Sequence, residues 1–365
     1  MKAPFISIFA LLLIVIPMQA ESLPTWIGTG GKGAKGIYLT YLDTETGKLK
    51  EPTLAAEIQS PGFVVLNAAK DRLYAATGAN EGSVASFAIE PDGTLVLLTA
   101  VSTGDGAPAH LCLDQTGKHL FSAQYGGGSV TSYPILEDGS IGERVSLIEH
   151  SGSGPNPQRQ KEPHPHSVGI SPDNQFLLVP DLGIDQVVIY RVDQATSALT
   201  AHGAGIGVPG GGPRHFKFSK DGSKVYLLNE LVASITTFAY DAQAGTTIAG
   251  ATVSALPEGW NDLGNSGAEV RVHPNGRFIY SSNRGHDTIA VFAADEAGGN
   301  LTLIENEPIR GATPRNFNID PSGKWLIAAG QSSNTLAVFA IDKTTGTLAY
   351  TGNVINCPSP ICVTF

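Results

Sequence analysis

The sequence contains little charge, few cysteines and no long hydrophobic run beyond its N-terminus. Only 15% of its 365 residues are charged while 42% are hydrophobic, which excludes a disordered chain. Three cysteines are too few for a disulfide-dense scaffold. Acidic residues outnumber basic ones by 33 to 23, so the chain lacks the basic footprint that binding to nucleic acid or to an anionic membrane requires.

Motifs of several common chemistries are also missing. No cysteine and histidine cluster has zinc-like spacing, and His164-Pro-His166 is too short a motif, so we expect no metal and no cofactor. There is no G-x-S-x-G elbow for a nucleophilic serine. The glycine-rich segment 205–212 lacks the Lys and Ser/Thr of a phosphate-binding loop. Cys357 and Cys362 allow two interpretations, one disulfide bridge or two buried thiols.

The N-terminus is typical of a secretory signal peptide. Lys2 precedes an apolar run over residues 5–18, which is shorter than the roughly 20 residues of a transmembrane helix. Small Ala20 suits a cleavage site before Glu21. We therefore expect residues 1–20 to be a signal peptide, residues 21–365 to be a single exported domain, and the mature chain to be independent of the membrane.

Glycine and proline, 43 and 23 residues, argue against a helical bundle and mark a repeat. Each repeat has a Pro or Gly, an apolar strand, a tight turn, a second strand, and a third strand ending near an aromatic residue. Strands this short at intervals of 46 to 57 residues are typical of four-stranded propeller blades. The repeats open at Pro61, Pro108, Pro165, Pro213, Gly267, Pro314 and Pro360.

The seventh repeat is incomplete, because residues 360–365 supply one strand only. Residues 25–29, 36–40 and 44–48 repeat the pattern of second, third and fourth strands. The sequence therefore predicts an all-β, seven-bladed β-propeller whose last blade is closed by N- and C-terminal strands, which removes exposed sheet edges.

Two repeats are longer than the rest, through residues 149–164 and 253–266, the latter containing Trp260, Asn261 and Asp262. Both additions join the fourth strand of one blade to the first strand of the next. That connection lies on the same face as the loop between strands two and three. We expect the additions to wall one mouth of the central channel, since long loops in compact folds are often functional.

Charged side chains occupy repeat positions next to the axis, where small or apolar residues are the rule. The residues after the repeat openings include His166, Arg214 and Arg315, and those after the second strands include Glu230 and Arg284. Both sets reach the same face, so one carboxylate should meet several cations in a concave mouth. The other polar residues predicted to line it are His110, His164, His215, Asn229 and Asn283.

A structural role competes with a functional one at several of these positions. His110 and His164 are also consistent with structural histidines, and Arg159 with a solvated or lid residue. Asn229 and Asn283 are also typical of loop caps. A structural ion network is the alternative for Arg214, Glu230 and Arg284, although burying unpaired ions is costly.

The chain carries an ordered set of motifs, which are Arg159-Gln160, PHPHSV (163–168), PDLGID (180–185), GGPRHF (211–216), LNEL (228–231), SSNRGHD (281–287), TPRNFNIDPSGKWL (313–326) and SPICVTF (359–365). These motifs resemble those of the seven-bladed lactonase family, which includes a 6-phosphogluconolactonase and the carboxy-cis,cis-muconate lactonizing cyclase. The resemblance spans essentially the whole mature chain.

The resemblance implies an active site. In the cyclase branch a His, two Arg and a Glu act in motifs that match here at His166, Arg214, Glu230 and Arg284. For a metal-free lactonase, the hypothesis is that Glu230 positions or deprotonates water, that Arg214, Arg284 and Arg315 stabilise the oxyanion, and that His166 protonates the leaving ring oxygen.

The export signal bears on the substrate. Phosphorylated sugar lactones and muconates are cytoplasmic metabolites, whereas oxidation of glucose outside the inner membrane yields glucono-1,5-lactone. We therefore favour a periplasmic gluconolactonase, with 6-phosphogluconolactonase or carboxy-muconate cyclase activity at the same site as alternatives. A non-catalytic ligand-binding propeller is a further alternative, because fold does not fix function. The sequence does not indicate the oligomeric state.

Overall fold

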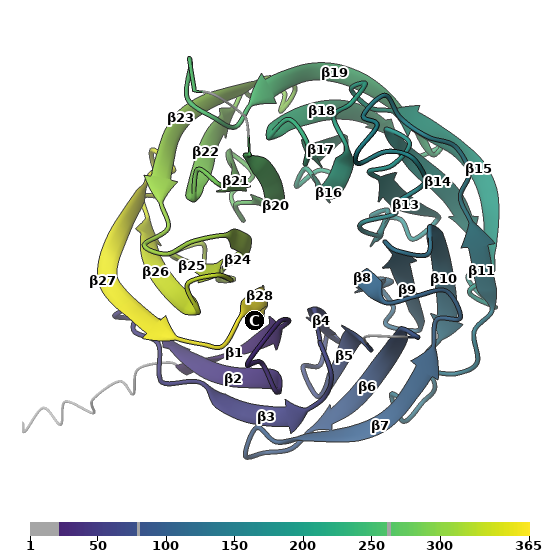
Figure 1. Ribbon diagram of the computed structural model, residues 1–365, viewed down its shortest axis with the longest axis horizontal. Helices are drawn as coiled ribbons and strands as arrows, with labels where there is room; N and C mark the ends of the chain where they lie inside the picture. Colours follow the sequence, from purple (N-terminus) through teal and green to yellow (C-terminus); the bar gives the residue numbers. More distant parts are fainter. Residues whose placement is uncertain (1–21, 79–80, 261–263) are drawn as a thin grey trace, which may run out of the picture.

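The computed structural model describes residues 22–78, 81–260 and 264–365, and the strands of this part form a ring of seven blades (Figure 1). Its 28 strands make seven antiparallel four-stranded sheets, and the described residues contain no helix. The predicted seven-bladed β-propeller is therefore confirmed. The expected signal peptide, residues 1–20, lies outside the described residues, and within them no helix is long and apolar enough to cross a membrane.

Six blades are built from consecutive strands, with the first strand nearest the axis. They comprise β4 (Phe63–Leu66), β5 (Arg72–Thr77), β6 (Ser83–Ile89) and β7 (Leu95–Ser102); β8 (Pro108–Leu113), β9 (His119–Gln124), β10 (Ser129–Pro134) and β11 (Ser146–Glu149); β12 (Gly169–Ile170), β13 (Phe176–Asp181), β14 (Gln186–Val192) and β15 (Leu199–Ile206); β16 (Pro213–Phe218), β17 (Lys224–Asn229), β18 (Ser234–Asp241) and β19 (Thr246–Ser254); β20 (Ser266–Val272), β21 (Phe278–Arg284), β22 (Thr288–Ala294) and β23 (Leu301–Pro308); and β24 (Pro314–Ile319), β25 (Trp325–Gly330), β26 (Thr335–Ile341) and β27 (Leu348–Asn356).

The closing blade joins the two ends of the described chain. Its inner strand is β28 (Pro360–Thr364), followed outward by β1 (Ser22–Thr29), β2 (Gly36–Asp43) and β3 (Thr53–Glu57). Strands β28 and β1 are antiparallel and lie side by side in Figure 1. The shared blade is as expected, but the assignment of residues 44–48 to its fourth strand is wrong. These residues form a turn, in which Asp43 Oδ1 accepts hydrogen bonds from the Glu45 and Thr46 N–H groups.

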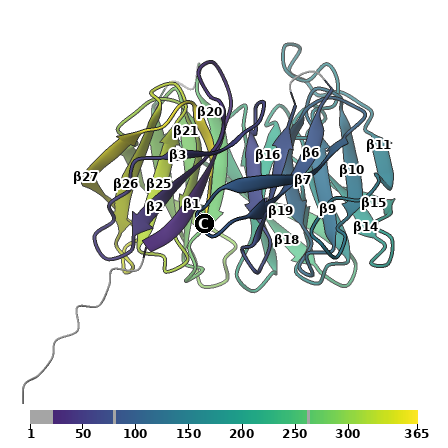
Figure 2. The same ribbon diagram turned by 90° about the horizontal axis from the view of Figure 1, so that it is seen from below.

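Backbone conformation explains the tight turns between first and second strands. The predicted turn positions have positive φ, and they are Gly117, Asn174, Gly222, Gly276 and Gly323. Glycine adopts this conformation without steric cost, and asparagine tolerates it better than most residues. Because inner strands start at one face and end at the other, these turns mark the face opposite the mouth, as the edge-on view in Figure 2 helps to follow.

Apolar clusters between neighbouring sheets hold the blades together. One such cluster lies on each side of the closing blade. The first contains the fully buried Val64 and Ile37, and the second contains the fully buried Val363 and Ile327. Cys357 and Cys362 also lie in these clusters as free thiols, so no disulfide joins them. Burial raises the pKa of Cys357 to about 12, which keeps its thiol protonated and unreactive.

Candidate functional site

The structure gathers three of the predicted side chains around a fourth, the buried carboxylate of Glu230. Glu230 follows β17 directly and is 4% exposed. Its Oε2 atom lies 2.9 Å from Arg214 Nε and 3.2 Å from Arg284 Nη2. The same oxygen is 3.9 Å from His166 Nε2. A buried carboxylate therefore faces two guanidinium groups and one imidazole.

Blade geometry explains why residues so far apart in sequence meet. Arg214 is the second residue of β16, His166 precedes β12, and Arg284 is the last residue of β21. A first strand begins, and a second strand ends, on the same face of an antiparallel blade. The convergence expected from the repeat positions is thus present at one mouth of the channel.

The first of the two additions, residues 149–164, contains an arginine that was not among the predicted site residues. Arg159 Nη2 lies 2.8 Å from Glu230 Oε1 and donates to Tyr125 Oη over 3.2 Å. Its side chain is 42% exposed, so it covers the carboxylate from the solvent side. Arg159 is thus partly solvated and also contacts the site, and Tyr125, the residue after β9, lies beside it. The sequence feature that could have indicated this contact is that Arg159 is the single arginine of residues 149–164.

Charge balance around Glu230 sets its protonation state. Burial alone would raise the pKa of Glu230, but Arg284 and Arg214 outweigh it and hold that pKa well below its ordinary value. Burial, with repulsion from Arg284, lowers the pKa of Arg214 to about 9. Glu230 is therefore a carboxylate and Arg214 a cation at neutral pH.

His166 and Arg315 complete the mouth. Burial and the Arg214 guanidinium hold the pKa of His166 well below 6.5, so its imidazole is neutral at pH 7. Burial and repulsion from Arg284 also lower the pKa of Arg315. Among the described residues the Arg315 side chain has no hydrogen-bond partner, which leaves its guanidinium available to a ligand oxygen.

Two predicted residues lie deeper in the channel than the mouth. The His215 ring is 5.2 Å from the His166 ring and 5.1 Å from the His110 ring, measured between centroids. His215 Nδ1 lies 3.2 Å from Oε1 of Glu269, a second carboxylate that is fully buried. His110 packs on Phe63, with ring centroids 3.9 Å apart. His110 and His215 therefore form a layer beneath the Glu230 cluster.

The remaining predicted residues make contacts within the protein. His164 stacks on Tyr125 at 4.4 Å, and its Nδ1 is 2.9 Å from the Tyr125 carbonyl oxygen. Asn229 Nδ2 donates to the hydroxyls of Ser234 and Thr236, and Asn283 Nδ2 donates to the Ala255 carbonyl. Both asparagines are fully buried. Asn283 bonds a backbone carbonyl as a loop cap does, whereas Asn229 bonds only side-chain hydroxyls.

The described residues offer no group of three or more His, Cys, Asp or Glu side chains that could hold a metal ion. The mouth instead combines a carboxylate, a neutral imidazole and guanidinium groups. Such a set can bind an oxygen-rich ligand, take up a proton and stabilise an oxyanion.

Comparison with known proteins finds one family along nearly the whole chain. The family model described as "Lactonase, 7-bladed beta-propeller" matches residues 24–365. A 6-phosphogluconolactonase of Bacillus subtilis is 35% identical over 343 residues, covering 93% of this chain and 97% of that protein.

Solved structures agree with the sequence match. The periplasmic gluconolactonase of Pseudomonas aeruginosa superposes with a TM-score of 0.88 at 31% identity, covering 94% of this chain and 98% of that one. A putative 6-phosphogluconolactonase of Bacteroides fragilis gives a TM-score of 0.87 at 34% identity, covering 94% and 97%. The similarity therefore extends over the whole ring.

Proposed function

The chain belongs to the seven-bladed β-propeller lactonase family, and we propose that it is a lactone hydrolase that opens glucono-1,5-lactone at the Glu230 mouth. The observation that carries this proposal is the position of His166 Nε2, 3.9 Å from a carboxylate that arginines hold ionised. A neutral imidazole can act as a general base, and the nearby negative charge offsets part of the cost of protonating it.

Attack begins with a water molecule within hydrogen-bond distance of both His166 Nε2 and Glu230 Oε2. Glu230 orients this water, and its lowered pKa keeps it ionised, so the proton passes to the neutral imidazole of His166. His166 takes one proton as the water oxygen bonds to the lactone carbonyl carbon. The carbonyl oxygen becomes an oxyanion, which Arg315 and Arg284 stabilise.

Ring opening returns the proton. The bond between the carbonyl carbon and the ring oxygen breaks, and the imidazolium of His166 gives its proton to that oxygen. The product is a hydroxy acid, which loses its acidic proton to solvent. His166 thus acts first as base and then as acid, while Arg214 keeps Glu230 ionised beside it.

The substrate and compartment are proposed together. The expected signal peptide and the similarity to a periplasmic gluconolactonase support glucono-1,5-lactone outside the cytoplasm. A second candidate substrate is 6-phosphogluconolactone, which the similarity to the Bacillus subtilis protein and the available guanidinium of Arg315 favour.

The test compares opening of the two lactones by EDTA-treated protein at constant pH, with spontaneous hydrolysis subtracted. We expect turnover of glucono-1,5-lactone, and a loss of about 100-fold or more in kcat/KM for His166→Asn and Glu230→Gln. Arg159→Gln, which alters only a half-exposed contact, should raise KM with little change in stability.

Glu162→Gln is the matched control, because Glu162 is an exposed carboxylate of the same insertion. Denaturant unfolding of each variant separates loss of chemistry from loss of fold. Full activity of both His166→Asn and Glu230→Gln would sink the proposed site. Faster turnover of the phosphorylated lactone would transfer the assignment to the second candidate, and ligand retention without turnover would indicate a binding protein.

A further inference from the structure

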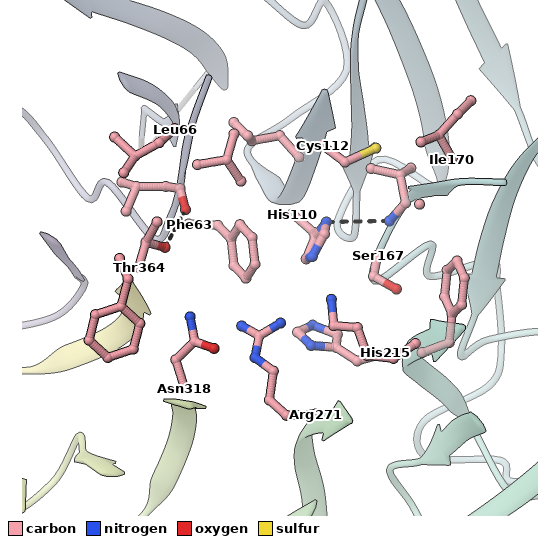
Figure 3. A pocket seen from close by; sticks show the side chains of 18 of the residues that line it. Phe63, Leu66, His110, Cys112, Ser167, Ile170, His215, Arg271, Asn318 and Thr364 are labelled. Atoms are coloured by element: carbon pink, nitrogen blue, oxygen red, sulfur yellow. Dashed lines mark hydrogen bonds between the residues drawn. The ribbon is translucent and has the colours of Figure 1, made fainter. Parts of the chain in front are cut away.

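A second cavity opens at the other end of the central channel. It has a volume of about 440 Å³ and is lined by the later residues of the inner strands (Figure 3). Asn67, Ala68 and Lys70, in the turn between β4 and β5, form part of its rim. Because that turn lies on the face opposite the mouth, the cavity is separate from the Glu230 site. His110 and His215 lie between the two.

One side of this cavity is cationic. Lys217, on β16, has no hydrogen-bond or ion-pair partner for its ammonium among the described residues. Arg271, on β20, uses Nε on the Phe317 carbonyl oxygen at 3.3 Å and Nη2 on Glu269 at 3.4 Å. Its Nη1 donors have no partner within the described structure.

The charges around Lys217 leave one cation without a counter-ion. Glu269 is matched by Arg271, and its carboxylate also accepts from the Asn316 side chain and the Val270 N–H. Burial keeps His110 and His215 neutral by holding the pKa of each well below 6.5. Burial likewise lowers the pKa of Lys217 to about 8, so its ammonium is charged at pH 7.

Neighbouring thiols and the chain terminus do not supply that counter-ion. Burial raises the pKa of Cys112 to about 12 and also raises that of Cys362, so both thiols are neutral. Phe365 lines the cavity, but its carboxylate forms no ion pair with Lys217 or Arg271 in the described structure. A partly buried ammonium without a partner is costly, which favours an anionic ligand.

The opposite wall is apolar. Figure 3 places Phe63 and Leu66 across the cavity from Arg271, and Ile170 further along the same wall. Two neutral donors lie between the walls. The Ser167 hydroxyl is buried without a partner, and His110 Nδ1 accepts from the Val168 N–H, so a neutral His110 carries its proton on Nε2.

We propose that this cavity binds a small monocarboxylate with an apolar body, with the carboxylate on Lys217 and Arg271 and the body against Phe63 and Leu66. A monoanion matches the single uncompensated charge. The apolar wall favours a ligand with a hydrocarbon part over a hydrated inorganic anion. The site does not depend on the proposed lactone hydrolysis.

Isothermal titration of the purified protein tests the proposal with benzoate and hexanoate as probes, against benzyl alcohol and inorganic phosphate. We expect saturable binding of the two carboxylates and at least tenfold weaker binding of the two comparison compounds. Lys217→Met keeps the aliphatic stem and should weaken carboxylate binding at least tenfold. Lys220→Met is the matched control, because Lys220 is exposed just beyond β16. This variant should bind both carboxylates as the unchanged protein does.

Ala68→Glu provides a second variant that alters only the turn at the rim. Its carboxylate should compete for the cations and weaken binding of both probes, whether or not Lys217→Met folds. Equal binding of benzyl alcohol or of phosphate would overturn the proposed ligand class. Absence of carboxylate binding, or binding that survives both Lys217→Met and Ala68→Glu, would overturn the site.

Discussion

His166 differs from an exposed histidine because it is buried among arginines. The cost of charging its imidazole there is larger than in water, and Arg214 adds repulsion. In the proposed mechanism the neutral imidazole is the base, so the setting that disfavours protonation also keeps the catalytic form populated. Glu230 offsets part of the cost of protonating His166, because its negative charge stabilises the imidazolium that forms during the reaction.

The first prediction concerns the dependence of rate on pH. The pKa of His166 in the free protein lies well below 6.5, so the base form dominates above that lowered value. We expect kcat/KM to stay level from pH 8 to below pH 6.5 and to fall only as acid protonates His166. Lactone opening followed by acid release between pH 5 and 8 measures this. Half of the activity lost near pH 6.5 would contradict the assigned base.

At the scale of single residues, part of the site could be predicted from the sequence. Arg214, Glu230 and Arg284 occupy repeat positions whose place in a blade is fixed by strand order. The contact between Arg159 and Glu230 could not be predicted, since an insertion follows no repeat. The cationic cavity could not be predicted from the residues next to the repeat openings, because Lys217 and Arg271 lie two residues further along their strands than His215 and Glu269.

At the scale of structural elements, one contact between neighbouring blades recurs around the ring. It is made by the turn between the third and fourth strands of a blade. In three blades a tyrosine of the second strand donates its hydroxyl to a glycine carbonyl in the last turn of the next blade. The pairs are Tyr74 with Gly139 at 3.1 Å, Tyr226 with Gly298 at 3.0 Å, and Tyr280 with Gly346 at 2.7 Å. At the closing blade, Trp325 Nε1 donates to the Thr44 carbonyl in the same way.

Glycine is required where this turn meets the neighbouring blade. Gly346 has a φ of 78°, and a Cβ atom there would lie 2.4 Å from the Phe278 ring. The same applies to Gly47, where a Cβ would lie 2.6 Å from the Trp325 ring. The Thr-Gly-Thr-Leu pattern at 345–348 is therefore an inter-blade contact, which explains why the equivalent residues 44–48 are a turn and not a strand.

The second prediction tests this contact with Tyr280→Phe. Removing the hydroxyl leaves the Gly346 carbonyl without its donor in a buried place, at a cost of about 1 to 2 kcal/mol in the free energy of unfolding. Urea unfolding measures the difference. Tyr350→Phe is the control, because the partly buried Tyr350 packs on the same cluster without a hydroxyl hydrogen bond among the described residues. Equal stability of the two variants would show that the contact contributes nothing.

For the molecule as a whole, closure depends on five residues at the C-terminus. Val363 in β28 is fully buried, its N–H donates to Asn316 Oδ1 at 2.9 Å, and its carbonyl accepts from Asn318 Nδ2 at 3.0 Å. These contacts tie β28 to β24 of the preceding blade while the ladder ties it to β1. One strand therefore connects two blades.

The third prediction follows from that position. Val363→Ala should lower the free energy of unfolding by about 2 kcal/mol, since it opens a cavity in a buried cluster. Val354→Ala, at a valine that is 43% exposed in β27, should change it by less than about 0.5 kcal/mol. Deleting residues 360–365 should abolish soluble expression. A soluble truncated protein with unchanged unfolding would contradict the role given to β28.

The ring architecture was the most predictable feature of this chain. It follows from strand length, from turn glycines such as Gly222 and Gly276, and from the spacing of the repeats. Each of these depends on residues that are close together in the sequence. The identity of the fourth strand of the closing blade was harder, because β3 is short and partly exposed and shows weak alternation. Cavities in the channel depend on seven strands at once and have no local pattern.

The shared blade also determines when the protein can finish folding. Strand β28 is synthesised after the other described strands, yet β1 has no inner neighbour without it. Until the final residues are available, the inner edge of β1 and the clusters beside it stay open to unwanted pairing. The ring can therefore close only after β28 is available to pair with β1.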